Sequence, residues 1–165
     1  MGLDITSYSN LKKGKESEDG IYIGKGPEHV TRHQYSEGWY EPTLETEGHY
    51  FRAGSYGGYN QFRGHLCAAI HGVECEEFWT NDKYKGTAFY ELIDFSDCEG
   101  VIGVEESKKL HAEFVSHRDT FKNYIESKLR EDEIDTLAYS HCMEKYDDWT
   151  LAFKISSQNG ALLFG

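Results

Sequence analysis

The segment best suited to hold an anion is a glycine-rich turn that leads into a helix. Glycines at 54, 57 and 58 expose backbone N–H groups, and the start of the following helix carries partial positive charge. Six nearby residues are candidates for a ligand site: Arg52, Ser55, Tyr56, Tyr59, Asn60 and Arg63. An arginine can grip a phosphate through two parallel hydrogen bonds, and a tyrosine ring can stack on a base.

No GKS or GKT sequence follows this turn, so it is not a Walker motif. The alternative interpretation is a glycine turn that packing requires. Tyr59 would then lie in the core and Arg63 would form a surface ion pair.

The loop SDCEG at 96–100 is the second candidate. Its thiol lies between two carboxylates, which raise a thiol pKa and make Cys98 a poor nucleophile. The pattern is typical of a turn in which Ser96 and Asp97 bond the backbone and Gly100 takes a positive φ. The alternative is a ligand-facing loop, in which case Ser96 and Asp97 join the ligand-binding candidates.

A third group holds metal-ligand residue types. Cys67 and His71 are four residues apart on one helix face, and Cys75 follows just beyond the helix. His65 lies roughly 200° around the helix from Cys67, which is incompatible with a four-ligand site. We therefore predict no bound metal, but a buried thiol and surface histidines.

A fourth motif, His29-Val30-Thr31, would indicate a two-histidine phosphoesterase if it occurred twice. It occurs once, because no other histidine is followed two residues later by threonine. The sequence thus yields no predicted catalytic residue and no cofactor.

The charge balance limits the partners. The chain of 165 residues has net charge -12, with 17 Lys and Arg against 29 Asp and Glu. A nucleic-acid partner needs a basic face, so none is expected. The excess of acid is uneven: residues 1–66 carry 7 basic and 9 acidic residues, and the remainder carries 10 and 20. An anionic ligand is therefore expected in the first part.

Other bulk features indicate a soluble cytoplasmic protein. No apolar run approaches the roughly 20 residues that span a membrane, and the N-terminus does not resemble a secretory signal. Four scattered cysteines are expected to be reduced thiols.

The elements that must position these residues follow from periodicity. Residues 2–8 and 21–23 read as strands that could pair as a hairpin, and 49–53 reads as extended. A helix follows the glycine turn and ends at Gly72. Residues 24–48 are expected to be irregular, with one short strand around Trp39.

The second half is predicted to contain a strand at 89–95, helices at 104–129 and 131–157, and a terminal strand at 161–164. The expected fold is one α+β domain, 1–165: a small antiparallel sheet of short strands with three helices, the last two long and antiparallel. Seven residues should be mostly buried: Leu110, Phe114, Phe121, Ile134, Tyr146, Trp149 and Phe153.

Three stretches resemble a family of small uncharacterised proteins carried by bacteriophages and prophages. They are MGLDI at the start, RAGSYGGYNQFR at 52–63 and FYELIDFSDCEGVIG at 89–103. The resemblance runs through most of the chain. It implies a phage context and a host bacterial cytoplasm, and it assigns no activity to any residue.

Three hypotheses about function remain. The first is a non-enzymatic protein that binds and sequesters a small anionic nucleotide-type signal of bacterial immunity, such as a cyclic nucleotide or an ADP-ribose derivative. The second is an acidic inhibitor or mimic that binds a basic host protein. The third is a small hydrolase acting on a nucleotide signal. No membrane partner is expected, and a homo-oligomer is left open.

Overall fold

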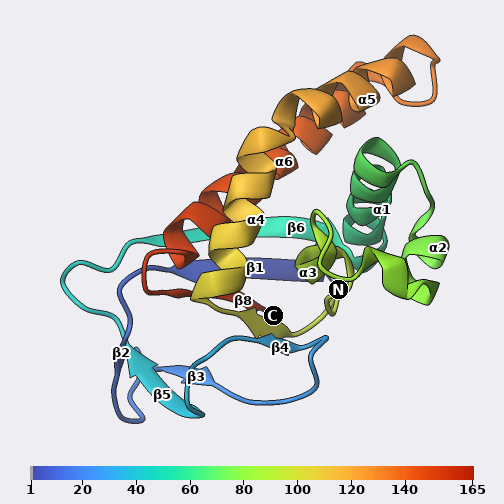
Figure 1. The fold of residues 1–165 in the computed structure, drawn as a ribbon. Coiled ribbons are helices and arrows are strands. Elements are labelled where there is room, and N and C mark those ends of the chain that lie inside the picture. Colours follow the sequence, from blue (N-terminus) through green and yellow to red (C-terminus); the bar gives the residue numbers. More distant parts are fainter. Residues whose placement is uncertain (1) are drawn as a thin grey trace.

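The centre of the computed structural model is a mixed five-stranded sheet with the order β4-β7-β8-β1-β6 (Figure 1). The model describes residues 2–165, so Met1, which opens the MGLDI motif, lies outside the described residues. The strands are β1 Gly2–Tyr8, β4 Thr31–Arg32, β6 Gly48–Ser55, β7 Gly100–Ile102 and β8 Ala161–Phe164. All neighbours are antiparallel except β4 and β7, which are parallel. The prediction of a purely antiparallel sheet is wrong there, because the long connection between them, residues 33–99, brings β7 back in the same direction as β4.

A second, three-stranded antiparallel sheet packs on the opposite side of the main sheet from the helices. It consists of β2 Lys12–Lys13, β5 Gly38–Glu41 and β3 Ile21–Ile23, in that order. Alternate residues of β8 serve the two sides: Leu162 and Phe164 join the helical core, while Ala161 and Leu163 contact the small sheet. The described chain therefore forms three layers.

The predicted hairpin of residues 2–8 with 21–23 does not form. Strand β3 pairs with β5, the short strand expected around Trp39, and β1 lies between β6 and β8. Leu3, Ile5 and Ser7 are fully buried on one face of β1. A buried central strand needs a neighbour long enough to pair with its backbone N–H and C=O groups, and β6, with eight residues, is long enough to do so.

The described residues contain six α-helices, where three were predicted. They are α1 Tyr56–Leu66, α2 Cys75–Thr80, α3 Tyr90–Ile93, α4 Val104–Ser116, α5 Arg118–Arg130 and α6 Thr136–Ser156. Helix α1 continues into a π-helical turn, η1 Cys67–His71, which ends at Gly72 in the left-handed conformation (φ 68°), as predicted. A 3-10 turn, η2 Asp82–Tyr84, follows α2 in a segment that was predicted to be a connection.

The strand predicted at 89–95 is wrong, because this segment contains α3. Phe89 has a φ of 62° and its N–H donates to Glu113 Oε2 at 2.8 Å, which turns the chain into the helix. Leu92 and Ile93 are then fully buried. A short apolar run of this kind has no periodicity that separates a buried strand from a buried helix.

The last helices form an antiparallel arm, as predicted (Figure 1). The predicted helix 104–129 is divided at His117 into α4 and α5, and both pack against α6. Helix α6 begins after Asp135, whose carboxylate accepts from Ala138 N at 2.7 Å, and not at the acidic residues 131–133.

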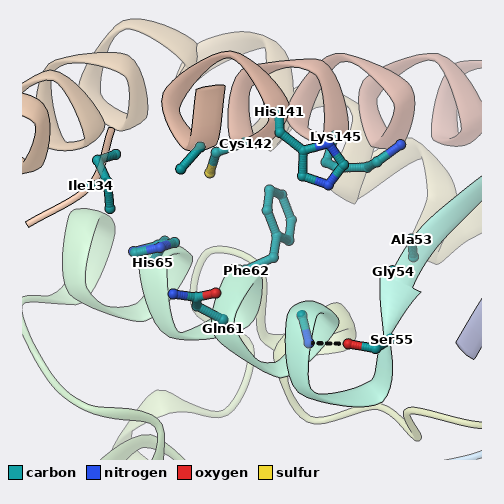
Figure 2. Close-up of a pocket in the computed structure, with 12 residues that line it drawn as sticks. Ala53, Gly54, Ser55, Gln61, Phe62, His65, Ile134, His141, Cys142 and Lys145 are labelled. Atoms are coloured by element: carbon teal, nitrogen blue, oxygen red, sulfur yellow. Dashed lines mark hydrogen bonds between the residues drawn. The ribbon is translucent and has the colours of Figure 1, made fainter. Parts of the chain in front are cut away.

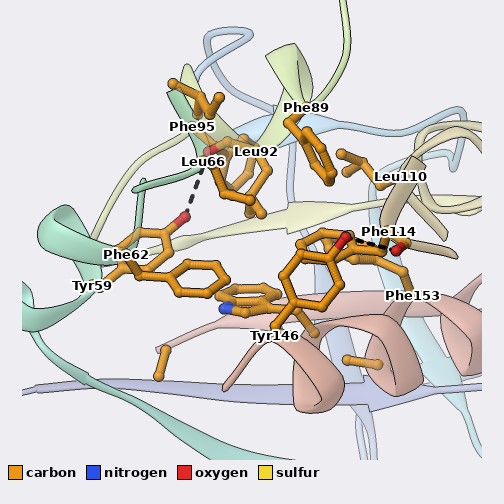
Figure 3. Packing of buried hydrophobic residues seen from close by; sticks show 14 of the residues in the cluster. Tyr59, Phe62, Leu66, Phe89, Leu92, Phe95, Leu110, Phe114, Tyr146 and Phe153 are labelled. Carbon is orange, nitrogen blue, oxygen red and sulfur yellow. Dashed lines mark hydrogen bonds between the residues drawn. The ribbon is translucent and has the colours of Figure 1, made fainter. Parts of the chain in front are cut away.

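Aromatic rings fill the main core (Figure 3). Of the seven residues predicted to be buried, six are fully buried and Ile134 is partly buried. Trp149 lies against Phe51, Tyr59 and Phe164, with ring centroids 5.1 to 5.8 Å apart. Among residues 2–165, no helix is long and apolar enough to span a bilayer.

Candidate functional site

A groove of about 250 Å³ lies between the first turns of α1 and the first half of α6 (Figure 2). Residues from β6 and α1 form one wall, and residues from the α6 side form the other. The lining residues are Ala53, Gly54, Ser55, Gly58, Gln61, Phe62, His65, Ile134, Ala138, His141, Cys142 and Lys145. Of the eight candidates, Ser55 is the one that lines this groove.

The α1 wall begins with the glycine turn that the sequence singles out. Gly54 has a φ of 128°, a conformation that favours glycine, and it links β6 to the helix. Ser55 caps α1, since its hydroxyl accepts from Gly58 N at 3.0 Å. Gly57 and Gly58 place no side chain over the first turn, so the helix start is open to the groove side.

The α6 wall contributes a lysine that is held in place. Lys145 Nζ lies 3.2 Å from Asp148 Oδ2, and the two side chains are 13% and 21% exposed. His49 Nε2 lies 3.5 Å from the other oxygen of Asp148. The ammonium also lies 5.7 Å from the Phe51 ring centroid. Lys145 is therefore a positioned, partly shared positive charge and not a free surface lysine.

The floor and the far end of the groove are less polar. Phe62 is buried and lies between the two walls in Figure 2, while His65 and Ile134 lie at the end away from Ser55. Burial raises the pKa of the Cys142 thiol to about 12, so this thiol is protonated at neutral pH. Burial, together with the charge of Lys128, lowers the pKa of His65, so its imidazole is neutral at pH 7.

Arg63 was expected on the surface, and the structure corrects this. The residue is 5% exposed. Its guanidinium donates to the carbonyl oxygens of Ile93 and Phe95, at 3.1 and 2.5 Å, and to Asn60 Oδ1. The guanidinium carbon also lies 4.6 Å from the Tyr59 ring centroid. Arg63 thus ties α1 to the chain around 93–95, and with Ser96 and Asp97 it also lines a second, shallow depression.

Other candidates gather around this arginine. Tyr59 is fully buried and donates to Leu92 O at 3.4 Å, as the packing interpretation predicted. Asn60 Nδ2 donates to Asp97 Oδ2 at 3.1 Å, and Ser96 Oγ accepts from Cys98 N and Glu99 N, as in the predicted turn. Helix α1 and the SDCEG loop therefore meet through the hydrogen bond of Asn60 with Asp97, beside an Arg63–Asp97 ion pair at 4.0 Å.

The two remaining candidates lie elsewhere. Arg52 is exposed beside Asp4, whose two carboxylate oxygens accept from its Nη1 at 3.1 and 3.2 Å. Arg32 and Arg63 are both buried while Arg52 is exposed, so the three arginines of the first part do not converge on one pocket. Tyr56 is half-buried and packs against the main core.

Sequence reasoning missed the α6 wall. His141 and Lys145 line the groove, and nothing in their spacing relates them to the glycine turn, whereas Gln61, also missed, lies in α1 directly after it. One signal was available, because Ala138, Cys142 and Lys145 fall at spacings of four and three on one face of a helix, and all three line the groove. This face of α6 reaches α1 because α6 packs on the main sheet. The residues that make these contacts are far apart in the chain, so the sequence does not reveal them.

Comparison with known proteins does not add to this geometry. No protein-family model matches the chain, and no curated protein and no solved structure matches it either.

Proposed function

We propose that this protein binds a small anionic molecule of nucleotide type in the groove between α1 and α6 and does not transform it. The observation that carries the proposal is that Lys145 and the first turn of α1 line the same cavity, above a buried aromatic ring. A phosphate favours both a fixed ammonium and the N–H groups of a helix start. Because the chain has a net charge of -12, a site with these positive groups differs in charge from most of the protein.

The groove offers a separate partner to each part of a nucleotide. The phosphate would lie between Lys145 and the turn at Ser55, and the base would contact Phe62. Gln61 and His65 supply hydrogen-bonding groups for a base edge or a ribose. About 250 Å³ is slightly below the volume of a typical pocket for a drug-sized ligand, so part of the ligand would remain in the open mouth.

The protonation states favour binding over catalysis. The Cys142 thiol has a pKa raised by burial, which makes it a poor nucleophile at neutral pH. His65 has a lowered pKa and is neutral, but no nucleophile among the described residues is hydrogen-bonded to it. A hydrolase would need an activated nucleophile or a positioned base, and the groove lining supports neither role.

The biological setting of the proposal comes from the sequence. Resemblance to phage and prophage proteins supports sequestration of a nucleotide signal of bacterial immunity in the host cytoplasm. The ligand class and the setting are separate parts of the proposal, because the groove would bind such a molecule in any context.

A thermal-shift screen tests the proposal directly. The panel contains cyclic mononucleotides, cyclic dinucleotides, ADP-ribose and its cyclic derivatives, with inorganic phosphate and free nucleosides as controls. A ligand present at a hundred times its Kd stabilises the folded state by about 2.7 kcal/mol, which should raise the Tm by roughly 5–10 °C. No shift with any phosphorylated member, or equal shifts with the free nucleosides, would contradict the proposal.

A protein-binding role is the second candidate function, and one surface favours it. A shallow depression between α5 and α6 is lined by apolar Met143 and Leu151 and by charged side chains of both signs: Arg118, Lys122, Glu144, Asp147 and Asp148. Leu137, on the same helix, is 78% exposed. Apolar side chains surrounded by charged ones suit a protein partner, although Arg118 already pairs with Asp147 at 2.9 Å.

A further inference from the structure

Two buried thiols outside the groove lie unusually close together. Cys67 begins the π-helical turn η1 and Cys75 begins α2, and their Sγ atoms are 3.2 Å apart. They are 0% and 7% exposed, and both are free cysteines. Two sulfur atoms come closer than their van der Waals contact only through an S–H···S hydrogen bond or a covalent bond. A small movement would therefore bring the two sulfur atoms to the bonding distance of about 2.05 Å.

The surroundings of the pair do not complete a metal site. His71, the third member of the sequence motif, lies with Nε2 2.8 Å from Ala88 O, which occupies that nitrogen. Nowhere in residues 2–165 do three His, Cys, Asp or Glu side chains gather in a metal-binding arrangement. The chemistry that remains for the two cysteines is that of a dithiol.

The two sulfurs are not equivalent. The hydrogen bond between the two thiols lowers the pKa of Cys75 and raises that of Cys67. The guanidinium of Arg63 also lowers the pKa of Cys75, against the effects of burial and of the charges of Glu76 and Glu74. Cys75 is the less completely buried residue of the pair, and the nearby Gly72 and Glu74 are exposed. Accessibility and charge therefore select the same atom as the nucleophile.

We propose that Cys67 and Cys75 are a reversible redox pair that a low-molecular-weight disulfide of the glutathione class oxidises to an intrachain disulfide. Local opening of 72–74 admits the oxidant. The Cys75 thiolate attacks one glutathione sulfur, the glutathione S–S bond breaks, and one glutathione leaves as a thiolate that takes up a proton. A mixed disulfide on Cys75 results.

The second step closes the protein disulfide. Cys67 loses its proton and attacks Cys75 Sγ, the mixed disulfide breaks, and the second glutathione leaves and takes up a proton. Two electrons and two protons thus pass from the two cysteines to one glutathione disulfide, which yields two glutathione thiols. A reducing cytoplasm reverses both steps.

The bond would fix α2 against η1. Helix α2 carries Trp79, whose Nε1 donates to Ile93 O at 3.0 Å and whose ring centroid lies 5.5 Å from the Arg63 guanidinium carbon. The disulfide would therefore restrain the cluster of side chains that supports 93–97. It also closes the loop 67–75 in the unfolded chain, which should stabilise the folded state.

The test uses the full chain with Cys98→Ser and Cys142→Ser, which leaves only the proposed pair. The protein is equilibrated with buffers of oxidised and reduced glutathione, both when folded and during refolding from urea, and its free thiols are alkylated and counted by mass spectrometry. We expect loss of both free thiols without bound glutathione, a rise in Tm of roughly 5–10 °C, and full reversal by dithiothreitol. The matched control adds Cys75→Ser and should keep its single thiol free or carry one glutathione.

Two results would overturn the proposal. One is that both thiols stay free after refolding in mostly oxidised glutathione, because refolding removes limited access as a cause. The other is that oxidation yields only covalent dimers or only protein–glutathione adducts. The control variant has no partner thiol within the chain, so it identifies adducts that do not depend on the pair.

Discussion

Replacing Arg63 by alanine is expected to lower the free energy of unfolding by about 3–5 kcal/mol. The guanidinium is 5% exposed and donates to two carbonyl oxygens and to Asn60. Its removal leaves the carbonyl oxygens of Ile93 and Phe95 without this donor inside the protein. It also removes the cation from between the rings of Tyr59 and Trp79.

Arg52→Ala is the matched control for this prediction. Arg52 lies in the same segment and pairs with Asp4, but its side chain is 53% exposed. Its replacement should change the free energy of unfolding by no more than about 1 kcal/mol. Urea denaturation followed by circular dichroism measures both. An Arg63→Ala variant that fails to fold agrees with the expectation, whereas equal stability of the two variants would show that Arg63 is not a structural strut.

The second large effect is expected from Gly160→Ala, which should destabilise the protein by about 3 kcal/mol or more. Gly160 lies where the chain enters β8, and a Cβ there would collide with the backbone of Tyr8 and come within 2.8 Å of Ser9 Cα. Both contacts are with backbone atoms, which cannot rotate away as a side chain can. The end of β1 and the start of β8 would have to separate.

Gly64→Ala provides the opposite case with the same substitution. A Cβ at Gly64 meets nothing within 4 Å, and the residue lies inside α1. Alanine should therefore stabilise the protein by about 0.5–1 kcal/mol. Thermal unfolding of both variants should move the Tm in opposite directions. A Gly160→Ala variant as stable as the parent protein would contradict the close contact of β1 with β8.

Local patterns in the sequence were enough to find the elements with strong periodicity. The alternation of residues 2–8, the glycine turn before α1, the end of η1 at Gly72 and the terminal strand 161–164 all match the structure. In each case, the side chains and the backbone preferences of neighbouring residues agree. The buried face of α6 followed from its regular spacing for the same reason.

Features that depend on distant contacts could not be predicted. Phe89 takes a positive φ because Glu113, on another helix, accepts its N–H. The parallel pairing of β4 with β7 depends on the path of the chain between them. Arg63 is buried because the carbonyl oxygens of Ile93 and Phe95 lie within its reach, and a sequence does not reveal that these atoms need a donor.

In the candidate site too, features set by local sequence were predicted and features set by distant contacts were not. The turn at Ser55 was predicted as one wall, since glycines before a helix are visible in the sequence. The opposite wall was not predicted, because His141 and Lys145 reach the turn only through the packing of α6 on the sheet. Lys145, a positively charged residue in the acidic second part of the chain, was thus not predicted to line the groove.

The most direct test of the proposed binding is calorimetric titration of Lys145→Gln with the ligand that the thermal-shift screen selects. Lys154→Gln is the matched control, because Lys154 is exposed on the same helix and its loss changes the net charge equally. Loss of a charge-assisted contact of roughly 1.5–3 kcal/mol should raise the Kd about 10- to 150-fold in Lys145→Gln. The Kd of Lys154→Gln should stay within about two-fold of the parent value. Equal affinity in the two variants, both folded, would contradict binding in this groove.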